Sequence, residues 1–159
     1  MLAIYTIAHD GYLFYFLKHR DIPVLIDKGF LDYGITSDEW LEETGVGLLR
    51  LKELDWCDTN IALIVHKDYS GQLKNCVSEY INIARRYLRD GKLDMEYVSG
   101  SCESLVPTEF DCCVGCVESG GTLRQNDLVI KEILLQSKIV LVGKEKINSD
   151  KMKRIYENL

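Results

Sequence analysis

Apolar and polar residues follow one another in short blocks whose lengths and periods predict the first elements of the chain. Two apolar, aromatic-rich runs, Leu2–Ala8 and Tyr12–Leu17, stand on either side of Asp10-Gly11, a pair typical of a tight turn between strands. After Asp21-Ile-Pro, apolar residues recur on one helical face until Gly29. We therefore expect a β-hairpin and then a short helix, with Asp21 as its N-cap and Gly29 as its C-cap.

The rest of the chain alternates strand-like and helix-like blocks. The expected strands are Leu31–Thr36, Ile61–Val65, Leu93–Val98, Cys112–Val117 and Ile139–Val142. The expected helices start at Ser37, span Val77–Arg89, form a turn over Leu123–Leu128, and close the chain from Ser149 with Met152, Ile155 and Tyr156 inward. Ile61–Val65 is entirely apolar, which is typical of a strand buried on both faces of a parallel sheet. Together the blocks predict an α/β fold with an open, mainly parallel sheet.

Three strand ends lead into short loops rich in glycine and hydroxyl side chains: Gly34–Ser37, Ser99–Glu103 and Glu118–Thr122. Ligands of open α/β sheets bind beyond the carboxyl ends of the strands. The pattern therefore fits three loops around one binding crevice, and it also fits three ordinary turns between strand and helix.

The loop Glu118–Thr122 carries the strongest chemical signal. Gly120 and Gly121 accept backbone conformations that other residues avoid, so the N–H groups of Gly120, Gly121 and Thr122 can converge on an anion. The hydroxyls of Ser119 and Thr122 lie beside them, and a helical turn with its positive end follows. This arrangement is typical of a phosphate-binding loop, although the same residues also occur in plain tight turns.

Composition limits the classes of function. The chain has 159 residues, of which 47% are apolar and 28% charged, as in a globular protein of one domain or two small lobes. A formal net charge of −6 argues against a nucleic-acid partner, and no apolar run approaches the roughly 20 residues of a membrane span. The N-terminal sequence lacks the features of a secretory signal, so a cytoplasmic protein is expected. Arg85, Arg86 and Arg89 form one basic cluster, typical of a solvated helix face or of a phosphate contact.

The six cysteines are expected to be reduced thiols. Cys113 and Cys116 have the spacing of a metal or redox pair, but they lie three apart in one expected strand. Because strand side chains alternate between faces, the two thiols would point to opposite sides of the sheet. Buried structural thiols are therefore the favoured interpretation. His9, His19 and His66 indicate no catalytic triad, and no covalent nucleophile is evident.

Five segments then resemble, in order, motifs of the ATP phosphoribosyltransferase catalytic subunit, the first enzyme of histidine biosynthesis. They are Phe14–Pro23 with its Asp-Ile-Pro, Gly29–Thr36 with Gly-x-x-Asp-x-Gly-Ile-Thr, Glu79–Tyr87, Gly100-Ser-x-Glu103, and Phe110–Asn126 with Ser-Gly-Gly-Thr-Leu-x-x-Asn. The last segment is similar to the phosphoribosyl-diphosphate signature of that family. The end of the chain resembles the short form, which has no C-terminal regulatory domain.

The resemblance implies a periplasmic-binding-protein-like (type II) fold of two lobes, with lobe I at 1–58 plus 134–159 and lobe II at 59–133. It implies a reaction in which N1 of ATP displaces diphosphate from phosphoribosyl diphosphate, with Mg²⁺ on the diphosphate. It also implies a homo-oligomer and a regulatory subunit similar to histidyl-tRNA synthetase. No metal ligand of the protein itself is implied.

The same resemblance assigns site residues. The loop Glu118, Ser119, Gly120, Gly121 and Thr122 would bind the 5-phosphate of phosphoribosyl diphosphate. Glu103 would be the catalytic carboxylate near the ribose or the adenine. On the nucleotide side, the implied residues are Gly34, Thr36 and Tyr80.

Two departures from the family pattern qualify the expected activity. The family has an acidic residue four positions before the loop serine, suited to the ribose hydroxyls, and this chain has Gly115 there. The chain also starts where the second strand of the family begins, so a basic loop of the family has no counterpart. We therefore expect weak turnover, and the alternative is a non-catalytic phosphate- or nucleotide-binding relative with a regulatory or assembly role.

Overall fold

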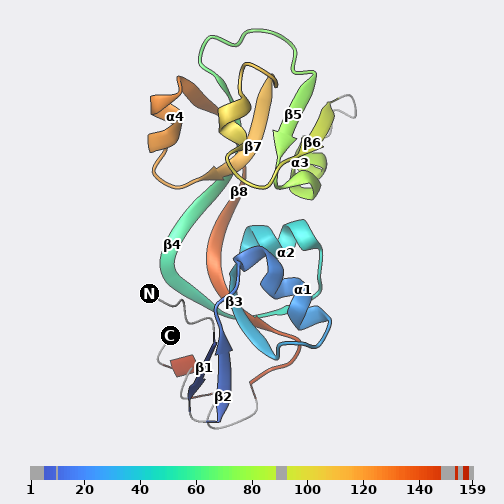
Figure 1. The fold of residues 1–159 in the computed structure, drawn as a ribbon, viewed down its shortest axis with the longest axis vertical. Helices are drawn as coiled ribbons and strands as arrows, with labels where there is room; N and C mark the ends of the chain where they lie inside the picture. Colours follow the sequence, from blue (N-terminus) through green and yellow to red (C-terminus); the bar gives the residue numbers. More distant parts are fainter. Residues whose placement is uncertain (1–5, 10, 89–92, 148–152, 154–155, 158–159) are drawn as a thin grey trace.

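A computed structural model describes residues 6–9, 11–88, 93–147, 153 and 156–157 of the chain. Its elements form two groups, joined by the long strands β4 (Leu49–His66) and β8 (Leu128–Gly143), which run from one group to the other (Figure 1). One group holds β1, β2, α1, β3 and α2, and the other holds β5, α3, β6, β7 and α4 (Figure 1). The division of the chain into 1–58 plus 134–159 and 59–133 stays a prediction.

The N-terminal hairpin is confirmed. β1 (Thr6–His9) pairs antiparallel with β2 (Tyr12–Tyr15), so that Thr6 lies opposite Tyr15. Gly11 occupies the turn with φ of +81°, a conformation that glycine adopts without steric cost.

The first helices also form where the sequence predicts them. A 3₁₀ turn, His19–Asp21, leads into α1 (Ile22–Asp27), and Gly29 ends this segment with φ of +78°. Asp21 takes the N-cap position of α1, but its side chain makes no capping hydrogen bond. After β3 (Tyr33–Ser37), α2 (Asp38–Thr44) starts at the N-cap Ser37 and ends at Gly45, whose φ is +67°.

The sheet is mixed, and the expectation of a mainly parallel sheet is wrong. Its strand order is β3-β8-β4-β7-β5-β6. Among the strands of the described residues, the pairs of β5 (Asn75–Ser78) with β6 (Asp94–Tyr97) and with β7 (Cys112–Val117) are parallel, and the other pairs are antiparallel. Ile61–Val65 is buried as expected, yet it lies antiparallel to both β7 and β8. The reason is that the chain enters the second group along β4 and leaves it along the adjacent β8, which must run in the opposite direction.

Several expected elements change their bounds. The strands expected at Ile61–Val65 and Ile139–Val142 belong to the longer β4 and β8, and two expected helical segments also differ. Val77–Arg89, expected as one helix, contains the end of β5 followed by α3 (Ile81–Tyr87), and Arg89 lies outside the described residues. The expected turn near Leu123–Leu128 is α4 (Gly121–Gln125). Of the last expected helix, Ser149, Met152 and Ile155 also lie outside the described residues. Tyr156 is described, and its hydroxyl donates a hydrogen bond to the Leu51 carbonyl at 3.0 Å.

Apolar side chains fill both faces of the sheet in the second group. Ile61, Leu63 and Ile83 pack on one face, and Ile64 and Val117 pack on the other. A third cluster packs α1 against β8 in the first group. No helix within the described ranges is long and apolar enough to cross a membrane.

Gly34 provides a test of this packing. A Cβ atom on Gly34 would lie 2.4 Å from Ile22 Cγ2 and 3.2 Å from Ile26 Cδ1, so α1 sits directly against the backbone of β3. We expect Gly34→Ala to lower the free energy of unfolding by about 1–3 kcal/mol, the usual cost of overpacking. Gly47→Ala is the matched control because nothing lies within 4 Å of its Cβ position. Urea unfolding compares the variants, and equal stabilities for both would contradict the packing role.

Candidate functional site

A cavity of about 270 Å³ lies between the two groups of elements. One wall comes from the segment before α1 and from α2, and the other from the loops after β5 and β6. The lining residues are Lys18, His19, Arg20, Trp40, Glu79, Ser99 and Gly100. Lys18, His19 and Arg20 form the basic wall of the cavity. The opposite wall presents the carboxylate of Glu79 and the loop residues Ser99 and Gly100.

Two contacts join the walls. Arg20 Nη1 donates hydrogen bonds to Ser99 Oγ at 2.8 Å and to Tyr97 OH at 3.4 Å. The rings of Trp40 and Tyr80 lie 4.8 Å apart between their centroids. These contacts hold the two walls together around the cavity.

Helices α2 and α3 also meet, through a carboxylate at a helix start. Glu43 Oε2 accepts hydrogen bonds from the main-chain N–H groups of Asn82 and Ile83, each at 2.9 Å, and Asn82 Nδ2 donates to the Glu43 carbonyl at 2.8 Å. A carboxylate in this place satisfies N–H groups that the helix itself leaves unpaired. Glu42 and Arg86 add an ion pair beside it. The start of α3 is thus fixed by a side chain from the other group.

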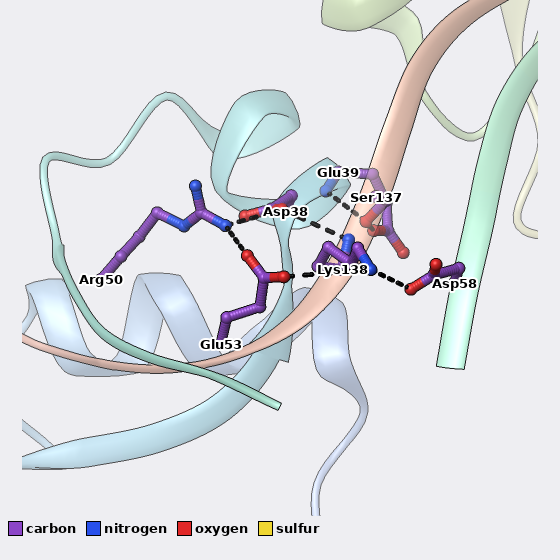
Figure 2. A network of polar contacts seen from close by, with 7 residues as sticks. All are labelled: Asp38, Glu39, Arg50, Glu53, Asp58, Ser137 and Lys138. Carbon is purple, nitrogen blue, oxygen red and sulfur yellow. Dashed lines mark hydrogen bonds and ion pairs between the residues drawn. The ribbon is translucent and has the colours of Figure 1, made fainter. Parts of the chain in front are cut away.

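The start of α2 is anchored on β8. Glu39, only 5% exposed, accepts a hydrogen bond from Ser37 Oγ at 2.7 Å. It also accepts one from Ser137 Oγ, which lies beside it on β8 (Figure 2). The Glu39 main-chain N–H donates to Ser137 Oγ at 3.3 Å. A buried carboxylate is costly unless it is hydrogen-bonded, so these two serines fix its position.

Charged side chains continue this network along the two long strands. Lys138 donates from its main-chain N to Asp38 Oδ2, at 3.2 Å, and its Nζ lies 2.7 Å from Asp58 Oδ1 (Figure 2). Arg50 Nη2 lies 3.1 Å from Asp38 Oδ2 and 3.5 Å from Glu53 Oε2. Burial raises the pKa of Asp38, and the Arg50 guanidinium acts in the opposite direction. The network links α2 to both strands where they pass between the groups.

The predicted nucleotide-side residues lie on or near these walls. Thr36 is fully buried at the end of β3, and its Oγ1 donates to the His19 carbonyl at 2.9 Å. Tyr80 is 3% exposed, and burial strongly raises the pKa of its hydroxyl. Gly34 faces Ile22 of α1, so the structure gives it a packing role. Thr36 therefore contacts the cavity-lining residue His19, and Tyr80 contacts the cavity-lining residue Trp40, but neither of the two lines the cavity itself.

Glu103 and the predicted phosphate loop lie on the second group, outside the lining of the cavity. Glu103 belongs to a 3₁₀ turn, Cys102–Leu105, and its Oε2 lies 3.8 Å from Cys102 Sγ. The loop Glu118–Thr122 follows β7, with Gly120 at φ of +67° and α4 starting at Gly121. Gly121 N–H donates to Ser119 Oγ at 3.4 Å. Within the described part of the chain, no acceptor is found for the N–H groups of Gly120 and Thr122, as an anion-binding loop requires.

The basic wall was missed from the sequence. Lys18, His19 and Arg20 are consecutive and directly precede Asp21-Ile-Pro. A run of three basic residues before a helix start was the available signal. Glu79 is the other omission, and its place at the end of β5, a strand that the periodicity did not reveal, explains why.

Gly115 lies buried in β7. A Cβ atom there would lie 3.1 Å from Cys102 Sγ and 3.6 Å from Ile64 Cδ1. A side chain at position 115 would therefore press against the Cys102 thiol.

Cys113 and Cys116 of β7 point to opposite faces as expected, but the prediction of buried thiols is wrong for Cys116 and for Cys57, which are exposed. Cys113 is fully buried and Cys116 is exposed, so they point to opposite faces, and all six thiols are free. Among the described residues, no group of three or more His, Cys, Asp or Glu side chains is placed to hold a metal ion.

Two solved structures define the class of fold. The ATP phosphoribosyl transferase (HisG:HisZ) complex from Thermotoga maritima matches with a TM-score of 0.84 at 17% identity, over 99% of this chain and 81% of that chain. A putative L-cystine ABC transporter from Listeria monocytogenes matches with a TM-score of 0.58 at 12% identity, over 91% and 69%. The protein therefore has an α/β fold of the periplasmic-binding-protein type.

Sequence relatives define the family. The profile described as "HisG: ATP phosphoribosyltransferase" matches residues 18–159. The ATP phosphoribosyltransferase of Clostridium botulinum (strain Okra) is 30% identical over 155 residues, covering 91% of this chain and 73% of that protein. That of Deinococcus radiodurans is 30% identical over 129 residues, covering 79% and 59%. The chain belongs to the ATP phosphoribosyltransferase family. It spans 59%, 51% and 58% of the lengths of three curated relatives, from D. radiodurans, Prosthecochloris aestuarii and Staphylococcus saprophyticus.

Glu79, which lines the cavity, makes the stability of the protein depend on pH. Burial raises the pKa of this carboxyl above its ordinary value of 4.5; Tyr80 and Arg20 act against the shift, while Glu103 and Glu39 add to it. The stability contributed by the protonated carboxyl is thus present below pH 4.5 and is lost as the pH rises through the raised pKa. We expect Glu79→Gln to raise the urea midpoint at pH 7.5 and to leave it unchanged at pH 4.

The matched control is Glu96→Gln, on the exposed side of β6, which should change the midpoint little at either pH. An equal gain from Glu79→Gln at both pH values would show that burial of the charge is not the cause.

Proposed function

We propose that this chain transfers the phosphoribosyl group of phosphoribosyl diphosphate to N1 of ATP, the first step of histidine biosynthesis, in the cytoplasm. The observation that carries the proposal is the family match over residues 18–159. The loop Glu118–Thr122 supports it, because this loop combines unpaired N–H groups with the motif of the phosphoribosyl-diphosphate signature.

In this proposal the 5-phosphate binds to Ser119, Gly120, Gly121 and Thr122. Gly120 adopts φ of +67°, which turns successive N–H groups toward one side of the loop. The helical turn of α4 places further N–H groups behind them. Charged acceptors bound to such N–H groups form hydrogen bonds about twice as strong as neutral ones.

The diphosphate and the triphosphate of ATP meet the basic wall of Lys18, His19 and Arg20. Three adjacent basic residues raise the local concentration of anions even though the whole chain carries a net charge of −6. Mg²⁺ fits this arrangement as a partner of the substrate, held by diphosphate oxygens and water rather than by a carboxylate cage. Bound there, it would neutralise charge on the leaving diphosphate.

The reaction forms the bond between N1 of the adenine and C1 of the ribose and breaks the bond between C1 and the diphosphate oxygen. C1 becomes cationic as diphosphate leaves, so the residues must mainly hold the two substrates in line and exclude water. We place Glu103 near the ribose or adenine as the catalytic carboxylate. Thr36 and Tyr80 support the nucleotide side through His19 and Trp40, and Gly34 supports it by packing α1 against β3.

We further propose that the chain works in an oligomer with a regulatory subunit similar to histidyl-tRNA synthetase. The solved relative from Thermotoga maritima is a HisG:HisZ complex, which supports an assembly of two kinds of subunit. Copurification of this chain with such a subunit, followed by light scattering, would test the assembly directly.

A non-catalytic relative that binds phosphate or nucleotide is the second candidate. Gly115 favours it, because it stands where the family has a ribose-binding carboxylate, and a side chain there would press against the Cys102 thiol. The contact between Arg20 and Ser99 also favours it, because it leaves a cavity of only about 270 Å³.

Titration calorimetry separates the two candidates. We expect phosphoribosyl diphosphate with Mg²⁺ to bind first and ATP to bind afterwards, with slow formation of N1-phosphoribosyl-ATP detected by ultraviolet absorbance. Gly120→Ala should weaken phosphoribosyl diphosphate binding about tenfold, because the free loop leaves a left-handed conformation that costs a side chain roughly 1–2 kcal/mol, and binding must restore it. Gly45→Ala is the matched control: it has the same φ of +67° at the end of α2, away from the loop. Binding without any turnover would favour the non-catalytic candidate, and no binding would reject both.

Gly115 provides a second test. Restoring the carboxylate requires room, so we expect the double variant Cys102→Ala, Gly115→Asp to bind phosphoribosyl diphosphate about tenfold or more tightly than Cys102→Ala alone. A charge-assisted hydrogen bond to the ribose hydroxyls is worth roughly 1.5–3 kcal/mol. Inorganic phosphate, which has no ribose, should bind the two proteins equally. Cys102→Ala, Gly115→Ala controls for the added Cβ, and equal gains for both ligands would show a general electrostatic effect instead.

A further inference from the structure

Arg124 belongs to none of the predicted site residues, yet it lies over the loop Glu118–Thr122. Its Nη1 donates a hydrogen bond to the Ser119 carbonyl at 3.1 Å, and its main-chain N–H donates to the Gly120 carbonyl at 3.2 Å. Side chains of a helix point back toward the helix start. The guanidinium thus reaches from α4 to the loop that precedes it.

Gly120 shows how close this approach is. A Cβ atom on Gly120 would lie 3.4 Å from Arg124 Nη1, and φ of Gly120 is +67°. Glycine therefore allows the left-handed turn here, and the guanidinium lies at ordinary contact distance beside it.

The hydrogen bond to Ser119 controls the polarity of the loop. A loop that binds an anion must turn its N–H groups toward the anion and its carbonyl groups away from it. The Ser119 carbonyl is held by Arg124, while the Ser119 hydroxyl accepts from Gly121 N–H at 3.4 Å. Both oxygens of this residue are thereby kept in fixed directions.

The charge of Arg124 is not neutralised elsewhere. Across the part of the chain that the structure describes, no carboxylate lies within ion-pair distance of its guanidinium. Glu118, in the loop itself, is exposed and negatively charged. Without a cation nearby, this carboxylate would repel a phosphate.

We propose that Arg124 is the positioning residue of the phosphate loop, which fixes the Ser119 carbonyl and supplies the positive charge that favours the dianion of a phosphate monoester. The inference rests on the proposed function, since it concerns the same loop.

Three variants test it: Arg124→Gln, Arg124→Lys and, as a matched control for charge, Lys131→Gln on the exposed part of β8. Inorganic phosphate and phosphoribosyl diphosphate with Mg²⁺ are titrated at pH 5 and pH 7.5, on either side of the second pKa of a phosphate monoester, roughly 6. At pH 7.5 we expect Arg124→Gln to lower the affinity for both ligands about tenfold or more, which is the effect of losing one charge-assisted hydrogen bond. Arg124→Lys should recover most of this loss, and Lys131→Gln should bind like the wild type.

The pH dependence of ligand affinity shows whether the positive charge of Arg124 favours the phosphate dianion or whether Arg124 only stabilises the loop. The wild type should bind the phosphate ester more tightly at pH 7.5 than at pH 5, and Arg124→Gln should flatten this difference. An unchanged affinity of Arg124→Gln, or an equal loss in Lys131→Gln, would overturn the inference, as would an equal loss at both pH values. If the wild type binds neither ligand, the proposed function falls and the inference falls with it. If the wild type binds and Arg124→Gln binds equally well, only the inference fails.

Discussion

The antiparallel pairing of β4 with β8 fixes how the two groups of elements are joined. These two strands are antiparallel neighbours and run between the two groups of elements (Figure 1). Because both crossings of the chain use one pair of strands, residues near 58 and 138 must lie side by side. β7 pairs antiparallel with the other side of β4 and leads out to the loop Glu118–Thr122.

The pairing is interrupted at the crossing itself. Leu54 lies opposite Ile139 and Asp58 lies opposite Lys138, so residues 55–57 of β4 bulge out between two adjacent residues of β8. Such bulges bend a strand and increase its local twist. Lys138 holds this point by its backbone to Asp38 and by its side chain to Asp58. Each exposed ion pair is worth little alone, but the buried Glu39 and Ser137 beside them give the network a fixed centre.

One short helix therefore connects the crossing to the cavity. The start of α2 is fixed on β8 by Asp38 and Glu39, and its later residues Trp40 and Glu43 contact the start of α3. The helix α2 has seven residues and is therefore only about 10 Å long. A change in the angle between β4 and β8 must therefore move its contacts with β8 and its contacts with α3 together. The geometry of the cavity is thus coupled to the interruption in β4.

The elements with local signals could be predicted from the sequence. Turn and cap residues such as Gly11, Gly29 and Ser37 mark their own conformations, and the hairpin, α1 and α2 formed where they stand. The outer half of β4 could not be predicted from apolar runs, because Leu49–Leu54 mixes leucine with charged residues and only Leu54 of this segment is buried. The prediction of mainly parallel strands was wrong for a different reason. The relative direction of two strands depends on which strands are neighbours in the sheet, and no local sequence signal contains that information.

The site shows the same division between local and long-range information. The bend of the loop Glu118–Thr122 could be predicted, because its glycines act within a few residues of one another; phosphate binding there stays a prediction. Gly34 looked like a ligand residue, yet the sequence does not distinguish a glycine that admits a ligand from one that admits the Ile22 side chain. The basic wall depends on a contact across the fold, in which buried Thr36 holds the carbonyl of His19. An acidic chain can therefore present the side chains of Lys18 and Arg20 to one cavity, because the fold, rather than the net charge, decides which side chains face it.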